Sequence, residues 1–193
     1  MKKPSFARNE EMNYLKKDFF ARDTITVARD LLGKTLVYKN CSGIIVETEA
    51  YKDDAASHAV TRPNKGIMLH DTYGHIYIYF IYGMYHCLNF TTEKEGTGAV
   101  LIRAIQPLTG FEEMRKRRAV DKDRNLTNGP GKLFQAFGFS SAHHGEVVGK
   151  SIKIQGTAIQ SDQKILQSPR IGISKAKELE WRFFIADNEF VSR

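Results

Sequence analysis

The chain has 193 residues, which is enough for one domain with a substantial hydrophobic core. Its 29 lysines and arginines outnumber its 22 acidic residues and give a formal charge of +7, which fits either a polyanionic partner or a basic, soluble surface. The two cysteines, Cys41 and Cys87, are far apart and argue against a zinc site or a disulfide framework. No apolar run approaches membrane-spanning length, so we expect a reduced, cytoplasmic protein without a membrane partner.

The order of the predicted elements indicates an α+β fold, because strands and helices mix without the βαβ rhythm of a parallel sheet. We expect residues 1–12 to form a loose N-terminal arm and residues 13–193 to form a single domain, since no linker or repeat divides them. Asp23 offers an N-cap to a helix that ends near Gly33. The other predicted elements are strands at Thr35–Tyr38, Gly43–Tyr51, His75–Ile81, Met84–Thr91, Ala99–Ile105, Ser151–Gln155 and Arg182–Ala186, and helices at Gly110–Arg118 and Pro130–Phe137.

The predicted strand Gly43–Tyr51 carries an unusual acidic face. Side chains alternate along a strand, so Glu47, Glu49 and Tyr51 point to the same side. The two carboxylates could provide a general base, an acid/base pair as in glycoside hydrolysis, or ligands for a metal ion. The alternative is a solvated strand face, which is the interpretation that this strand favours when it is considered by itself.

A run of aromatic and aliphatic residues from Ile76 to Asn89 is interrupted at Tyr82-Gly83, where a hairpin can turn. Aromatic residues are common in strands, so Tyr77 and Tyr85 are expected to be core side chains. Tyr82 fits the core poorly, because a large ring beside a turn glycine meets solvent, a partner or DNA. In DNA such a ring could act as a wedge between base steps.

Arg103 lies within an apolar run, and a buried guanidinium needs an acidic partner. Glu47 or Glu49 could be that partner. An ordinary internal ion pair explains Arg103 equally well. His58 and Asn89 are weak signals individually, since each is more often a structural polar residue than a site residue.

Two basic features could contact phosphates. The turn Asn128-Gly129-Pro130-Gly131-Lys132 precedes a helix, so the Gly131 backbone and the Lys132 side chain could bind a phosphate at the helix start. The cluster Arg115-Lys116-Arg117-Arg118 could add general attraction to DNA. A solvated helix end explains this cluster equally well.

Several linked motifs resemble the alkyladenine (3-methyladenine) DNA glycosylase family over most of the chain, from about residue 31 onward. Their order and spacing agree with the family, so a chance likeness is a poor explanation. The motifs are Ile45-Val46-Glu47-Thr48-Glu49-Ala50-Tyr51, Ala56-Ser57-His58, Tyr77-Ile78-Tyr79 with Tyr82-Gly83-Met84, Cys87-Leu88-Asn89, Leu101-Ile102-Arg103-Ala104 and Gly129-Pro130-Gly131-Lys132-Leu133.

The resemblance implies a role for each matched residue. Glu49 matches the acid that activates water, and Arg103 matches the arginine that helps to position the water and the carboxylate. Asn89 matches the residue that crowds the guanine 2-amino group. The remaining implied roles are enclosure of the flipped base by Tyr51, His58 and Tyr79, and insertion into the DNA by Tyr82 and Met84.

The resemblance also implies the fold and the activity. The fold would be a single domain with a curved, largely antiparallel mixed β-sheet, surrounding helices and a protruding β-hairpin. The activity would be that of a monofunctional DNA glycosylase of base excision repair, which acts without a cofactor or metal and leaves an abasic site. We expect a monomer that is cytoplasmic, or nucleoid-associated if the source is bacterial, and whose partner is double-stranded DNA containing damaged purines.

The implied substrates are 3-methyladenine and 7-methylguanine, with hypoxanthine and ethenoadenine as further candidates. The two neutral lesions require protonation of the leaving base, for which His58 is a candidate donor. No lysine lies in the pocket motifs, so we expect neither a Schiff base nor strand cleavage.

Two other classes of protein fit part of the pattern. A non-catalytic protein that bends DNA or senses damage could use Tyr82 as a wedge. A carbohydrate hydrolase could use Glu47 together with Glu49.

Overall fold

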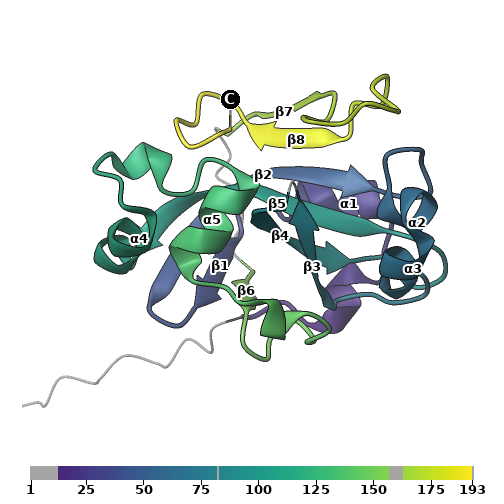
Figure 1. Ribbon diagram of the computed structural model, residues 1–193, viewed down its shortest axis with the longest axis horizontal. Helices are drawn as coiled ribbons and strands as arrows, with labels where there is room; N and C mark the ends of the chain where they lie inside the picture. Colours follow the sequence, from purple (N-terminus) through teal and green to yellow (C-terminus); the bar gives the residue numbers. More distant parts are fainter. Residues whose placement is uncertain (1–12, 82, 157–162, 193) are drawn as a thin grey trace, which may run out of the picture.

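The computed structural model describes residues 13–81, 83–156 and 163–192. These residues form eight strands and five α-helices, which Figure 1 shows together. The strands are β1 (Thr35–Tyr38), β2 (Cys41–Tyr51), β3 (Ile76–Ile81), β4 (Tyr85–Thr91), β5 (Ala99–Thr109), β6 (Lys153–Gln155), β7 (Ile165–Ser168) and β8 (Arg182–Ile185). The α-helices are α1 (Thr24–Asp30), α2 (His58–Thr61), α3 (Pro63–Gly66), α4 (Phe111–Arg118) and α5 (Pro130–Phe137).

All eight strands belong to one sheet. Its main path runs β3-β4-β5-β2-β1-β6, while β8 joins β2 and β7 joins β8. Each of the pairings between these strands is antiparallel. The predicted α+β class with an antiparallel sheet is therefore confirmed. Figure 1 shows α4 and α5 on one side of the sheet, α2 and α3 at its other end, and β8 along β2.

Strand β2 has neighbours along both of its edges. β5 pairs with it along one edge, while β1 pairs with its first residues and β8 with Glu47, Thr48 and Glu49 on the other edge. Register shifts on both sides of Glu47 mark a bulge against β5. Because neighbours cover it on both edges and both faces, all residues from 45 to 50 are buried.

The solvated strand face that the acidic pattern favours is wrong, because Glu47 and Glu49 are both 0% exposed. Several of the residues that contact them come from distant parts of the chain. Ile171 contacts Glu49 across a sequence separation of 122 residues, and Ser192 contacts Glu47 across 145. Alternation along a strand thus identifies which side chains share a face, but segments that fold onto the strand determine whether that face meets water.

Local signals at α1 agree with the structure. The Asp23 carboxylate accepts a hydrogen bond from the Thr26 N–H at 2.9 Å, which confirms the predicted N-cap. Gly33 follows the last turn with a φ of 78°, a conformation that glycine adopts at little cost. One buried hydrophobic cluster continues from Phe20 to Phe190, so elements from both ends of the described chain share a core.

Some elements differ from the prediction. β7 is absent from it, since this short strand is only partly buried and forms by pairing with β8. β5 continues past the predicted end to Thr109. The expected core position of Tyr85 is wrong, because its side chain is 49% exposed at the start of β4. Tyr82 and the predicted arm at residues 1–12 lie outside the described residues.

Among the described helices, none has the length and apolar character needed to cross a bilayer.

Candidate active site

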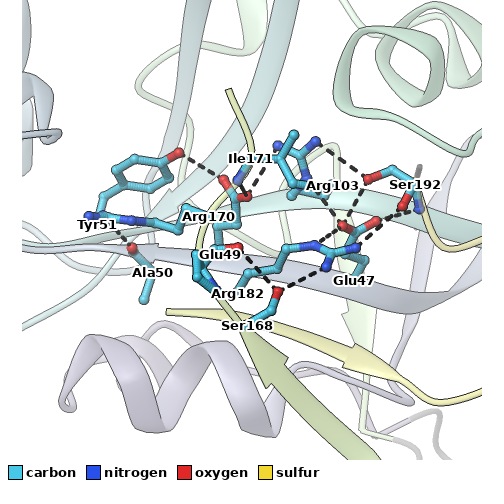
Figure 2. Close-up of polar contacts among 11 residues, drawn as sticks. Glu47, Glu49, Ala50, Tyr51, Arg103, Ser168, Arg170, Ile171, Arg182 and Ser192 are labelled. Carbon is cyan, nitrogen blue, oxygen red and sulfur yellow. Dashed lines mark hydrogen bonds and ion pairs between the residues drawn. The ribbon is translucent and has the colours of Figure 1, made fainter. Parts of the chain in front are cut away.

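Three donors hold the Glu49 carboxylate in β2 (Figure 2). The Tyr51 hydroxyl donates to Oε2 at 2.7 Å, and the Ile171 backbone N–H donates to Oε1 at 2.7 Å. Arg103 Nη1 lies 3.3 Å from Oε1. An ionised carboxylate has about four acceptor positions. The three donors therefore leave one acceptor position, on Oε2, unused by the described residues.

Glu47 is held by a different set of groups. Arg103 Nε lies 3.2 Å and Arg182 Nε 2.6 Å from Oε1, which also accepts from the Ser192 hydroxyl at 2.8 Å. The Ser192 N–H donates to Oε2 at 2.7 Å. Four charged or polar donors thus surround Glu47, and of the residues that supply them only Arg103 lines the pocket described below, so Glu47 lacks the access to a substrate that a glycosidase acid requires. The interpretation of Glu47 and Glu49 as a glycosidase pair loses its support, and Arg103 instead bridges the two carboxylates.

Burial sets the electrostatics of this site. It raises the pKa of Glu49, although Arg103, the Ile171 N–H and the Tyr51 hydroxyl all favour the ionised form. Burial next to Glu49 also raises the pKa of Tyr51, which therefore remains a donor. Burial lowers the pKa of Arg103, but the Glu49 and Glu47 carboxylates raise it by more, so this guanidinium stays charged. Glu49 is a carboxylate that accepts a proton more readily than a solvated glutamate does.

Replacing Glu49 with glutamine is expected to stabilise the protein relative to wild type as the pH rises. Because the pKa of Glu49 is raised on folding, its contribution to stability is full below the unfolded pKa, about 4.3, and is lost as the pH passes the folded pKa. Glutamine does not titrate. The difference in melting temperature between variant and wild type, measured by circular dichroism over a pH series, should grow with pH. A difference that does not depend on pH would contradict the raised pKa.

A pocket with a volume of about 1180 Å³ lies against this network. Its volume exceeds the ~300–1000 Å³ of common small-molecule sites, so it has room for a nucleobase together with parts of the adjoining sugar-phosphate backbone. Glu49 itself is fully covered and lies directly behind Tyr51, Arg103 and Ile171, which line the pocket. The other predicted site residues in the lining are His58, Tyr79, Asn89, Gly131 and Lys132.

Two rings form one part of the pocket wall. His58 begins α2, and its ring lies 3.7 Å from that of Tyr79 between centroids. The His58 Nδ1 lies 3.2 Å from the Tyr77 hydroxyl, whose pKa burial raises to about 12. Asn89 is buried on β4, and its Nδ2 donates to the Tyr77 carbonyl at 3.0 Å and to the Cys87 carbonyl at 3.3 Å. These bonds fix the orientation of the Asn89 amide at the pocket surface.

The hairpin between β3 and β4 reaches the pocket at Gly83, which has a φ of 68° and lines it. Met84, the next residue, is 65% exposed. Phe80 also lines the pocket and is 49% exposed. The tip of the hairpin therefore presents apolar side chains to solvent beside the pocket, where such groups are typical of an interaction site.

The first turn of α5 forms another part of the lining. Lys132 is exposed, and its Nζ donates to the Asn128 side chain at 2.9 Å. A Cβ on Gly131 would approach the Tyr85 ring to 3.0 Å, so glycine permits this close contact between α5 and β4. Lys132 and Lys175 both line the pocket, although the motifs that supply its predicted base-binding residues contain no lysine.

The basic cluster of α4 has mainly structural contacts. Arg115 donates to both carboxylate oxygens of Asp123 at 2.8 Å. Arg117 and Arg118 connect α4 to α5 and the segment before it, through bonds to the Ala136, Phe137 and Leu126 carbonyls and the Gln135 side chain. These contacts account for three arginines of the cluster without DNA. Arg118 also lines the pocket, so its position is compatible with both interpretations.

Sequence reasoning misses Arg182 and Arg170, two arginines that belong to this region. One signal points to Arg182: two buried carboxylates two residues apart need more positive charge than Arg103 alone supplies. Arg170 follows Pro169 in a segment without periodicity, and nothing in its sequence context distinguishes it. In the described part of the chain, no group of three or more His, Cys, Asp or Glu side chains gathers as a metal site would require.

Comparison with known proteins adds independent information. The family model for Methylpurine-DNA glycosylase (MPG) matches residues 18–189. A protein of Salinibacter ruber described as a candidate 3-methyladenine DNA glycosylase is 42% identical over 200 residues, which covers 94% of this chain and 97% of the relative. Proteins with the same description from Prosthecochloris aestuarii and Clostridium perfringens are 46% and 43% identical, cover 92% and 93% of this chain, and are themselves covered over 90% and 98%.

Proposed function

This chain belongs to the methylpurine-DNA glycosylase family, and from this premise we propose that it excises alkylated purines from duplex DNA. The damaged nucleotide would be flipped into the pocket, and a water activated by Glu49 would hydrolyse its N-glycosidic bond. We propose 3-methyladenine and 7-methylguanine as substrates, with hypoxanthine and ethenoadenine as further candidates. One observation carries the proposal: a buried carboxylate with one unused acceptor position lies directly behind a large pocket lined by aromatic rings.

The vacant acceptor position on Glu49 Oε2 suits a general base. A water that donates a hydrogen bond there could lose its proton to the carboxylate as it attacks C1′ of the flipped nucleotide. Arg103 would hold Glu49 in place and stabilise its ionised form before the reaction. Since burial raises the pKa of Glu49, the same carboxylate is also a competent acceptor for that proton.

The aromatic lining supports base capture. Extruding a base costs a few kcal/mol, and the cost is smallest at a damaged or mispaired site. Stacking against Tyr51 and the rings of Tyr79 and His58 would return about 1–3 kcal/mol per contact. Electron-rich rings also attract a cationic alkylated purine, which is already a good leaving group. Asn89 would crowd the 2-amino group of guanine, and its fixed amide orientation makes that position a rigid one.

His58 is our candidate for protonation of neutral leaving bases. The Tyr77 hydroxyl can donate to its Nδ1, which places the proton of the neutral imidazole on Nε2. We further propose that Tyr82 and Met84 insert into the minor groove at the hairpin tip, which is supported by the exposure of Met84 beside the pocket.

The direct test is release of the free base. Wild-type protein incubated with a duplex that carries 7-methylguanine should release 7-methylguanine and leave an unbroken strand with an abasic site. Binding without release would favour a damage sensor. Strand cleavage with a borohydride-trappable adduct would show that an amine of the protein forms a Schiff base, with Lys132 and Lys175 as the candidates in the pocket lining, and would contradict the monofunctional mechanism.

Replacing Lys132 with alanine is expected to weaken binding to all duplexes without changing lesion choice. A lysine that contacts one phosphate releases about one counterion, so the slope of log K against log salt should become less negative by about 0.9. Fluorescence anisotropy at several salt concentrations measures this slope.

The matched control is Lys150→Ala, because Lys150 is also exposed but does not line the pocket. Its salt slope should equal that of wild type. If the salt slope of Lys132→Ala also equals that of wild type, Lys132 does not contact a phosphate.

A further inference from the structure

Arg170 is an unexpected buried charge. It lies in the segment between β7 and β8, yet its side chain is 0% exposed. Nη1 donates to the Ala50 carbonyl at 3.0 Å and to Asp54 Oδ2 at 3.1 Å, while Nη2 donates to Asp54 Oδ1 at 2.8 Å. Both terminal nitrogens of the guanidinium therefore bind the Asp54 carboxylate, and Nη1 also binds the backbone of β2. Only arginine provides this geometry.

The same guanidinium lies over two aromatic rings. It is 4.6 Å from the centroid of the Tyr51 ring and 5.2 Å from that of Trp181. Arg170 thus supports the ring of Tyr51, whose hydroxyl donates to Glu49 Oε2. Its direct neighbour in the chain, Ile171, donates its backbone N–H to Glu49 Oε1. Figure 2 shows Tyr51, Arg170 and Ile171 around the Glu49 carboxylate.

Arg170 is therefore in contact with, or adjacent in the chain to, two of the three donors to Glu49. The third donor, Arg103, is held independently, because Glu47 and the Ser192 hydroxyl bind its guanidinium. Loss of the Arg170 clamp should loosen Tyr51 and Ile171 while Arg103 stays in place. Because the Arg170 side chain is fully buried, water does not replace Asp54 as its partner when the ion pair between them is weakened.

We propose that Arg170, clamped by Asp54, is a positioning residue that holds the Tyr51 hydroxyl and the Ile171 N–H against the Glu49 carboxylate. The proposal rests on the proposed function of Glu49 as the base that activates water. Arg170 does not touch the reacting atoms in this scheme. It determines which donors Glu49 has and therefore how the carboxylate is oriented toward the pocket.

The charged and titratable groups around Glu49 determine the sign of the expected effect. They are Glu47 and Tyr51 on β2, Cys87 on β4, Arg103 on β5, Arg182 on β8 and Arg170 itself. The Ile171 N–H and the Tyr51 hydroxyl both lower the pKa of Glu49 against the larger effect of burial. Weakening these two bonds should raise that pKa further, so that a smaller fraction of Glu49 is ionised at a given pH.

The test is the pH dependence of single-turnover excision of 7-methylguanine from a duplex by Arg170→Lys. Lysine keeps the charge but cannot bind both oxygens of the Asp54 carboxylate through two nitrogens of a planar group. We expect excision at neutral pH to be about ten-fold slower, the loss of roughly one hydrogen bond to a charged group. The acid limb of the profile should move to higher pH, and the dissociation constant for the duplex should stay at the wild-type value.

Asp54→Asn is the second variant, because it removes the charge of the clamp while its Oδ1 still accepts from the Ala56 N–H. Its acid limb should move in the same direction, and this variant decides the question if Arg170→Lys does not fold. The matched control is Arg22→Lys. Arg22 also binds a carboxylate, Asp30 at 2.8 Å, and lies 4.4 Å from a ring, Phe19, but these partners are not donors to Glu49.

The outcomes separate the two proposals. If Glu49→Gln is inactive but the acid limb of both clamp variants coincides with that of wild type, Arg170 has only a structural role and the inference is overturned. An equal change in Arg22→Lys would overturn it too. If Glu49→Gln excises at the wild-type rate, the proposed function fails first, and the positioning role fails with it.

Discussion

Glu49→Gln is expected to lower the rate of base release by about 10²–10⁴-fold, the range that general bases contribute. Glutamine has nearly the same shape and can still accept the Ile171 N–H, but its amide cannot take a proton from water. The loss should therefore appear in the single-turnover rate and not in the affinity for DNA. Rapid-quench measurement of released 7-methylguanine, together with binding of the same duplex, gives both quantities.

Glu180→Gln is the matched control, since it makes the same chemical change on an exposed side chain that does not line the pocket. It should excise at the wild-type rate. Retained excision by Glu49→Gln would reject the mechanism. Loss of binding together with activity would show that Glu49 holds the pocket together instead of activating water. The stability of the same variant relative to wild type should also increase as the pH rises, because the pKa of Glu49 is raised on folding.

The elements with strong local signals are predictable from the sequence. β1 begins and ends where the pattern places it, at Thr35 and Tyr38, and the N-cap of α1 forms at Asp23. β7 has no comparable signal, because only pairing with β8 makes it a strand. The resemblance to a family identifies residues that converge on one pocket, which periodicity alone cannot do.

The environment of the acidic strand is not predictable in the same way. Alternation places Glu47 and Glu49 on one side of β2, but whether water reaches them depends on Ile171 and Ser192, more than a hundred residues away. Arg170 is harder still, since a single arginine in an irregular segment looks like a solvated side chain. Its role depends on the point where that segment crosses β2, and this is a property of the folded chain.

Glu47→Gln is expected to lower the free energy of unfolding by about 3–5 kcal/mol, because it leaves two buried guanidiniums without their shared counter-charge. Glu47 is fully buried and binds Arg103 and Arg182 at 3.2 and 2.6 Å. A loss of this size is a large part of the ~5–15 kcal/mol that stabilises an ordinary domain. Urea unfolding followed by circular dichroism measures it, provided that the slope m is unchanged.

Asp123→Asn supplies the comparison, since Asp123 pairs with Arg115 at 2.8 Å but both side chains are about two-fifths exposed, at 39% and 42%. This exposed pair should contribute only about 0–1 kcal/mol. If Glu47→Gln lowers the free energy of unfolding by no more than Asp123→Asn does, Arg103 and Arg182 must find other partners in the folded state. Arg103 could then turn toward Glu49 alone and Arg182 toward Ser168, to which it already donates at 3.0 Å. That result would mean that Arg103 is positioned by Glu49 itself, and the two carboxylates would no longer have separate structural and chemical roles.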